Sequence, residues 1–342
     1  MKPGSPGKSG SSRFSNGMIR VKWSTSLMYA GPYPAPAKRF FKFETLQNAV
    51  EKCLQEKDRF FWSGLNTLSN NLPITSLQCD LIYEDALRLV YSLTLATQSR
   101  KLVYARLVIA KNHEECSALL EKECTALTIL AERCPGGVAP VAARGVIFLP
   151  DRHMRREVSR EVFAYFIKVP PGLTPLYVAS ATQFAPHGPK PARYSVKDTE
   201  VLKKSIVRVL AKCYEEKSGS GIVPADLCPE CFAVQHPLPA NNASSVLLQC
   251  PRVRKRLAPG YFMHALMFGI LGTGKHRMAL APVNPEAFFD ALTGAVGAEK
   301  AREWCRSLAH RRPGRDDLSP GEAAVELPGK DYLDALSAVA GL

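Results

Sequence analysis

The sequence lacks a long hydrophobic run. No apolar stretch approaches the ~18–20 residues that a helix needs to cross a bilayer, and the best candidate, residues 261–272, is short and contains His264. We therefore predict no transmembrane span. The start of the chain also lacks the apolar core of ~7–15 residues that is typical of a secretory signal, although a trimmed product would look the same.

Acidic side chains are absent from the first 43 residues, which hold eight basic ones. The whole chain has 45 Lys and Arg against 31 Asp and Glu, a formal net charge of +14, so more than half of the excess lies in this segment. Residues 1–17 are rich in Gly, Ser and Pro, which do not offset the entropy of ordering. We predict a basic flexible tail over residues 1–43 and interpret its charge as solvated. The alternative is electrostatic contact with an anionic membrane.

Two further absences concern ligands. The second basic cluster, residues 252–256, lacks the interleaved aromatic side chains on which single-stranded nucleic acids stack, so we predict no nucleic-acid partner. Cys228 and Cys231 form one Cys-x-x-Cys, but no second pair follows at the spacing of a zinc site. We predict no metal there, and the ten scattered cysteines do not indicate a compartment.

The bulk of the chain has a globular composition. It has 342 residues, of which 46% are hydrophobic and 22% charged, with a mean hydropathy of −0.09. This length excludes a miniature disulfide scaffold and predicts one large or two modest domains with a sizeable core.

Apolar periodicity predicts an α+β chain in two lobes. An amphipathic helix that begins near Glu44 predicts an N-terminal helical extension over residues 44–75. The apolar spacing indicates strands over 76–83, 89–97 and 101–111, a helix over 114–133, and strands over 141–149 and 162–169. A proline-rich loop is expected over 170–191. Ser195 and Asp198 offer capping chemistry for a further helix that ends near Lys217.

One segment carries a specific resemblance. Residues 221–234, GIVPADLCPECFAV, resemble the catalytic loop of the protein kinase family, G-I-V-H-R-D-L-K-P-E-N followed by a short apolar strand. The upstream elements fall in the family's order of hairpin, third strand, regulatory helix, two strands and hinge, and residues 308–332 resemble its last helices. The resemblance implies a bilobal protein kinase-like fold, with a β-rich N-lobe over residues 76–170 and a mostly helical C-lobe over 171–342.

The nucleotide-binding positions of this resemblance lack the residues that phosphoryl transfer needs. The glycine-rich turn aligns with Tyr83, Asp85 and Arg88, none of which is glycine, and the lysine of the third strand aligns with Leu107. Lys111, four residues on, is at most a relocated substitute. Glu123 falls at the position of the helix glutamate. Without a lysine partner, we interpret it as a solvated helix charge.

The catalytic and metal positions are also altered. Asp226 matches the residue that accepts the substrate hydroxyl proton, but an Asp beside a turn is equally a loop-capping group. Cys231 replaces the Mg²⁺-binding Asn, and a thiol is a poor ligand for this hard ion. Gln249 replaces the Asp of D-F-G, which removes the second carboxylate. We therefore expect neither ATP nor Mg²⁺ as a cofactor.

These losses together are similar to those of a pseudokinase. The missing glycine turn and the N-terminal helical extension resemble the secreted rhoptry kinases and pseudokinases of apicomplexan parasites, in particular their with-no-glycine-loop branch. This implies secretion into the parasitophorous vacuole or cyst wall, with a cytoplasmic location as the alternative. It also implies a catalytically inactive scaffold or allosteric regulator that binds an unidentified protein. The alternative is an atypical active kinase or ATP-binding protein that uses Asp226 and Lys111.

A rival motif lies in the second half of the chain. Residues 269–275 fit the phosphate-binding pattern G-x-x-x-x-G-K, but His276 replaces the Ser or Thr that holds Mg²⁺. No parallel βαβ pattern surrounds this segment, so we do not expect a P-loop nucleotide site.

Overall fold

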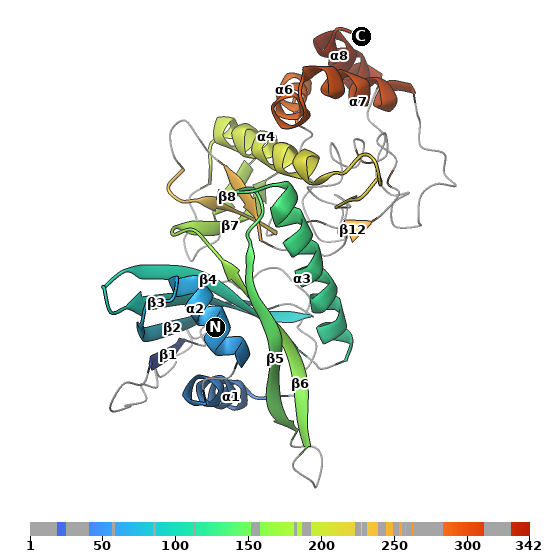
Figure 1. Cartoon of the computed structure of the whole chain (residues 1–342). Helices are drawn as coiled ribbons and strands as arrows, with labels where there is room; N and C mark the ends of the chain where they lie inside the picture. The colour runs from blue at the N-terminus through green and yellow to red at the C-terminus, as the bar shows by residue number, and fades with distance from the viewer. Residues whose placement is uncertain are drawn as a thin grey trace, which may run out of the picture. The chain divides into compact units, whose positions relative to one another are not determined.

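The chain divides into two compact units in a computed structural model (Figure 1). Unit 1 comprises residues 1–125 and 140–171, and unit 2 comprises residues 126–139 and 172–342. The structure describes residues 19–24, 41–56, 59–84, 87–111, 114–151, 158–180, 183–186, 193–222, 227, 231–238, 244–248, 253–254, 257, 262, 283–310 and 330–342.

Unit 1 is built on a six-stranded sheet in the order β1-β2-β3-β4-β6-β5. All neighbours are antiparallel except β1 and β2, which are parallel. The strands are β1 (Arg20–Ser24), β2 (Ile74–Glu84), β3 (Arg88–Thr97), β4 (Leu102–Ala110), β5 (Val141–Asp151) and β6 (Val158–Lys168). Three helices accompany them: α1 (Phe43–Gln55), α2 (Arg59–Ser69) and α3 (Glu115–Arg133), which continues into unit 2.

The predicted order of elements in this unit is confirmed. The hairpin, the third strand, the helix and the two following strands all occur, with ends that differ from the prediction by a few residues. The helical extension consists of two helices, α1 and α2, separated near residues 56–58.

The prediction that residues 1–43 are all flexible tail is wrong for residues 20–24, which form β1. Val21 and Trp23 are buried, whereas Arg20 and Lys22 are exposed, which is the alternation of a half-buried strand. Trp23 Nε1 donates to Glu51 of α1 at 3.0 Å, and its ring packs edge-on against Tyr91 at 5.5 Å. The basic residues thus occupy the solvent side of a short strand whose other side is core.

The two faces of the sheet are covered by different helices. Leu107 is paired with Phe166 across β4 and β6, and the Phe166 ring packs on Phe60 and Phe61 of α2, at 5.2 and 5.4 Å. Arg88 at the start of β3 faces α3 instead, since it is ion-paired with Glu123. Because paired residues share a face and successive residues alternate, each position on β4 belongs either to the α2 face or to the α3 face.

Unit 2 combines short strands with helices. A four-stranded sheet has the order β11-β10-β7-β8, and β9 pairs with β12. The strands are β7 (Leu173–Ser180), β8 (Gln183–Pro186), β9 (Gly221–Ile222), β10 (Phe232–Gln235), β11 (Ser245–Leu247) and β12 (Val253–Arg254), and the helices are α4 (Val196–Cys213), α6 (Pro285–Val296), α7 (Ala298–His310) and α8 (Lys330–Ala340). The loop predicted over residues 170–191 is therefore wrong, because β7 and β8 lie within it. The Tyr214 and Phe262 rings stack at 4.4 Å, and Trp304 packs edge-on against Tyr214.

The expected cap of α4 is confirmed, although the helix ends at Cys213 and not near Lys217. Ser195 Oγ accepts from the Asp198 N–H at 3.0 Å, and the Asp198 carboxylate accepts from the Ser195 N–H at 3.3 Å. We expect Ser195→Ala to lower the free energy of unfolding by ~1 kcal/mol, because the Asp198 N–H loses its acceptor. Urea unfolding measures this, with Ser195→Asn, another good capping residue, as the control. A loss as large in Ser195→Asn as in Ser195→Ala would contradict it.

Within the described part of the chain, no helix is long and apolar enough to cross a membrane.

Candidate functional site

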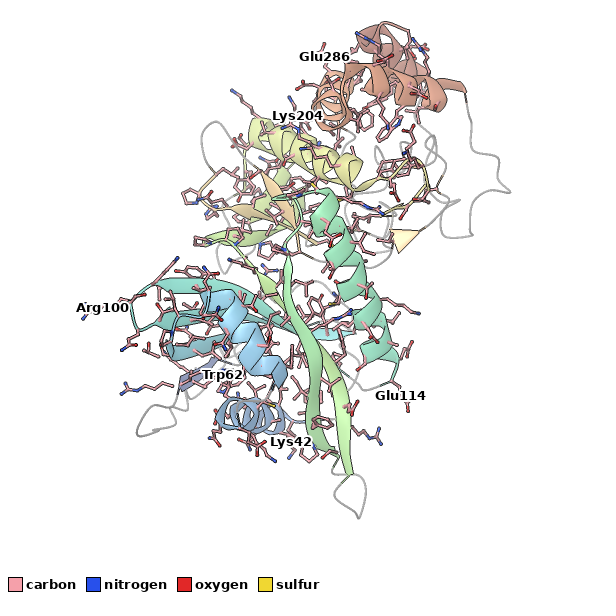
Figure 2. All side chains as sticks on the ribbon, viewed as in Figure 1. Lys42, Trp62, Arg100, Glu114, Lys204 and Glu286 are labelled. Atoms are coloured by element: carbon pink, nitrogen blue, oxygen red, sulfur yellow. The ribbon has the colours of Figure 1, made fainter. Side chains whose placement is uncertain are left out.

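A buried ion pair lies on the α3 face of the unit 1 sheet. Arg88 Nη1 donates to the two carboxylate oxygens of Glu123 at 2.7 and 2.5 Å. The two side chains are only 6% and 3% exposed. Arg88 begins β3, at the end opposite the β3–β4 turn that Arg100 marks in Figure 2. The sheet and α3 are thus joined by a charge-assisted hydrogen bond shielded from solvent.

A second buried ion pair lies at the end of β2. Lys111 Nζ is 3.0 Å from Glu84 Oε1, with side chains 2% and 5% exposed. The backbone N–H of Lys111 also donates to the Leu87 carbonyl at 2.8 Å. Because Glu84 is paired with Leu89 across the strands, its side chain belongs to the face opposite Arg88. The turn between β2 and β3 is therefore flanked by one buried ion pair on each side.

The environment around Glu123 holds neighbouring groups in their neutral forms. Burial, with a smaller contribution from the negative charge of Glu123, raises the pKa of Tyr165 well above its usual value. Tyr165 is opposite Val108, which places it on the α3 face. Burial also raises the pKa of Cys124 to about 11, against the opposing effect of Arg144. Beside the ion pair, therefore, these two groups stay protonated and uncharged at neutral pH.

The interpretation of Glu123 as a solvated, partnerless charge is wrong. Glu123 is 2% exposed, and its partner is Arg88, the residue aligned with the last position of the glycine-rich turn. In an active kinase, a lysine of the third strand makes this ion pair. Here an arginine of the preceding strand makes it.

Leu107 is buried, but on the α2 face, opposite Phe166. Ala110 of β4 pairs with Arg88 and therefore lies on the α3 face. Because successive residues of a strand alternate between faces, Val108 and Arg106 lie on that face as well. Arg106 is 5% exposed. The V-A-I-K pattern of the third strand can also be aligned so that it begins at Val103. In this register the lysine position falls on Arg106 and not on Leu107. The alternation of faces along β4 is the signal that favours this register.

The other aligned positions lie mainly outside the described residues. Asp85, Asp226 and Gln249 are among these, as is the side chain of Tyr83. Residues 263–282, which hold His264 and the G-x-x-x-x-G-K segment, also lie outside. Their predicted roles stay predictions.

The strands that flank the predicted catalytic loop, β9 and β10, are described, and each of them pairs with one of the two strands that flank Gln249. Ile222 pairs with Val253, and Phe232 pairs with Leu247. Cys231 is buried, and its carbonyl accepts from the Leu248 N–H at 2.8 Å. Along the sequence, Asp226 lies between β9 and β10, and Gln249 lies between β11 and β12. Among the described residues, no group of three or more His, Cys, Asp or Glu side chains is arranged to hold a metal ion.

Comparison with known proteins gives a distant likeness at the level of structure. No protein-family model matches the chain, and no curated protein matches it. Among solved structures, a mutant of the PAN3 pseudokinase from Neurospora crassa is similar, with 10% sequence identity over 84% of this chain and 70% of that chain, and a TM-score of 0.34.

Proposed function

We propose that the chain is a catalytically inactive, kinase-like protein that acts through protein binding, as a scaffold or an allosteric regulator. The observation that carries the proposal is the pairing of Arg88 with Glu123. In an active kinase, the glutamate at the position of Glu123 holds the phosphate-binding lysine. In this chain, Arg88 of β3 occupies that glutamate.

The positions of Leu107 and Lys111 support the same proposal. Leu107 lies on the α2 face, and the β4 residue that takes the lysine position on the α3 face is Arg106, so this position holds an arginine and not the phosphate-binding lysine. Lys111, the relocated cation of the alternative, is paired with Glu84 in a buried site. To reach a nucleotide phosphate it would have to give up this buried ion pair, which is costly. Together with the replacements at Cys231 and Gln249, this favours a chain without bound MgATP.

We also propose to which group of pseudokinases the chain belongs. The helices α1 and α2 and the turn without glycine support membership of the secreted, with-no-glycine-loop group of rhoptry pseudokinases, with the vacuole or cyst wall as the site of action. The test is the location of the epitope-tagged full-length protein in its native cell. A cytoplasmic signal would contradict this assignment and leave the inactive-protein proposal standing.

The experiment for the main proposal is a thermal-shift titration of the full chain with ATP, with and without Mg²⁺. A ligand present at 100 times its Kd stabilises a protein by ~2.7 kcal/mol. Because we propose that the chain does not bind the nucleotide, we expect the unfolding midpoint to shift by less than about 1 °C at millimolar ATP. An active kinase under the same conditions is the positive control. A clear Mg²⁺-dependent shift, together with phosphotransfer lost in Asp226→Asn, would overturn the proposal in favour of an atypical kinase.

A further inference from the structure

We propose that Cys134 and Cys213 form a peroxide-reactive dithiol site in unit 2, in which Cys134 attacks the oxidant and Cys213 closes a disulfide. This site is independent of the function proposed above. Cys134 directly follows the last residue of α3, and Cys213 is the last residue of α4. Neither is in a disulfide, and both are buried, at 3% and 0% exposed.

The two cysteine side chains are hydrogen-bonded to each other. The Cys213 thiol donates a hydrogen bond to the sulfur of Cys134. On its other side Cys134 Sγ lies close to Gly137, where a Cβ would be 2.4 Å from the sulfur and 3.1 Å from Val209 Cγ2. Val209 is one helical turn before Cys213 on α4. The neighbouring Arg133 reaches the same helix end, since its Nη1 donates to the Cys213 carbonyl at 3.4 Å.

The electrostatics favour Cys134 as the nucleophile. The hydrogen bond from Cys213, aided by the positive charge of Lys212, lowers the pKa of Cys134 to about 7 against the opposing effect of burial. By contrast, burial raises the pKa of Cys305 to about 12. At neutral pH Cys134 is therefore partly in the thiolate form, which is the reactive one, whereas Cys305 is protonated.

The chemistry balances with hydrogen peroxide as the oxidant. The Cys134 thiolate attacks one peroxide oxygen, the O–O bond breaks, and the products are a sulfenic acid and, after proton uptake, water. The Cys213 sulfur then attacks the Cys134 sulfur and loses its proton, the S–O bond breaks, and the second water leaves. Overall two thiols lose two electrons and hydrogen peroxide gains them. Burial of both sulfurs favours this small neutral oxidant over bulky disulfides such as oxidised glutathione.

The test exposes the folded full-length chain to hydrogen peroxide and maps its disulfides by mass spectrometry of non-reduced peptides. We expect a Cys134–Cys213 crosslink in the wild type. Cys213→Ser should instead accumulate a sulfenic acid on Cys134 that dimedone traps, and Cys134→Ser should lose both products. Cys305→Ser, a matched buried cysteine of unit 2, should keep the crosslink.

Several results would overturn the proposal. These are a crosslink that forms only in urea, a sulfenic acid trapped on Cys213 instead of Cys134, or equal crosslinking in Cys134→Ser through another cysteine.

The wild-type protein gives a check that needs no variant. The rate at which hydrogen peroxide forms the Cys134–Cys213 crosslink, followed by mass spectrometry, should be half-maximal near pH 7, about 1.5 pH units below an ordinary thiol. A midpoint at or above pH 8.5 would also contradict the assignment of Cys134 as the nucleophile.

Discussion

Glu123→Gln should lower the free energy of unfolding of unit 1 by ~3–5 kcal/mol. The amide keeps the size of the side chain but removes the negative charge that the buried Arg88 guanidinium contacts at 2.5 and 2.7 Å, and removing one partner of a buried ion pair has this cost. The measurement is hydrogen exchange of the β3 and α3 peptides in increasing urea, which reports on unit 1 separately from unit 2.

The double variant Arg88→Met/Glu123→Leu separates the ion pair from the packing around it. Replacing both charges with apolar side chains of similar volume removes the uncompensated charge, so we expect the stability to return to within about 1 kcal/mol of the wild type or to exceed it. Glu56→Gln is the matched control, because Glu56 pairs with Lys52 at 3.7 Å on the exposed surface of α1, where such pairs contribute little. Equal losses in Glu123→Gln and Glu56→Gln would contradict a buried pair.

The failure to predict this ion pair has a physical cause. Arg88 and Glu123 are 35 residues apart in the chain, and neither has a local pattern that marks it as buried. The sequence alignment assigned Arg88 to a turn and Glu123 to a solvated helix surface. Only the packing of α3 on the sheet brings the two together, and the sequence positions alone do not encode that contact.

The elements with strong local signals were predictable. The helix expected over 114–133 is α3 (Glu115–Arg133), because its leucines recur on one helical face and Cys134-Pro-Gly-Gly stops it. The start of α4 was predictable because Ser195 and Asp198 form a cap from neighbouring residues. Most strands of the unit 1 sheet were predictable for the same reason, since β-branched runs are bounded by turn residues.

The missed elements depend on distant partners. β1 has five residues and pairs with Ser76–Asp80 of β2, more than 50 positions along the chain. β7 lies in a proline-rich stretch that reads as a loop, yet its backbone pairs with β10 and β8. In both cases the pairing partner, and not the local composition, determines the structure. Of the candidate site, the pairing of Arg88 with Glu123 and the face to which Leu107 belongs required the strand register.

Gly145→Ala should destabilise unit 1 by ~1–3 kcal/mol, although alanine normally suits a strand better than glycine. A Cβ at this position would lie 2.5 Å from Phe60 Cγ and 2.7 Å from Phe60 Cβ. The Cβ of Phe60 is fixed to the backbone of α2, so the helix itself has to move away from β5. The result tests whether α2 is a packed part of unit 1, as the ring contacts of Phe166 indicate.

The sign of the change in stability caused by Gly145→Ala distinguishes a steric clash, which destabilises unit 1, from the reduced backbone freedom of alanine, which stabilises it. Gly294→Ala in α6 is the matched control, because its Cβ would meet only the end of the flexible Arg208 side chain, at 3.2 Å or more. We expect it to be neutral or to stabilise unit 2 by up to ~1 kcal/mol.

Phe60→Ala in the Gly145→Ala background removes the clashing ring, so the double variant should lose less stability than the sum of the two single variants. Strict additivity, or a stabilising Gly145→Ala, would mean that α2 does not pack on β5 at this glycine. The N-terminal helices would then be free to contact a partner protein in place of the sheet.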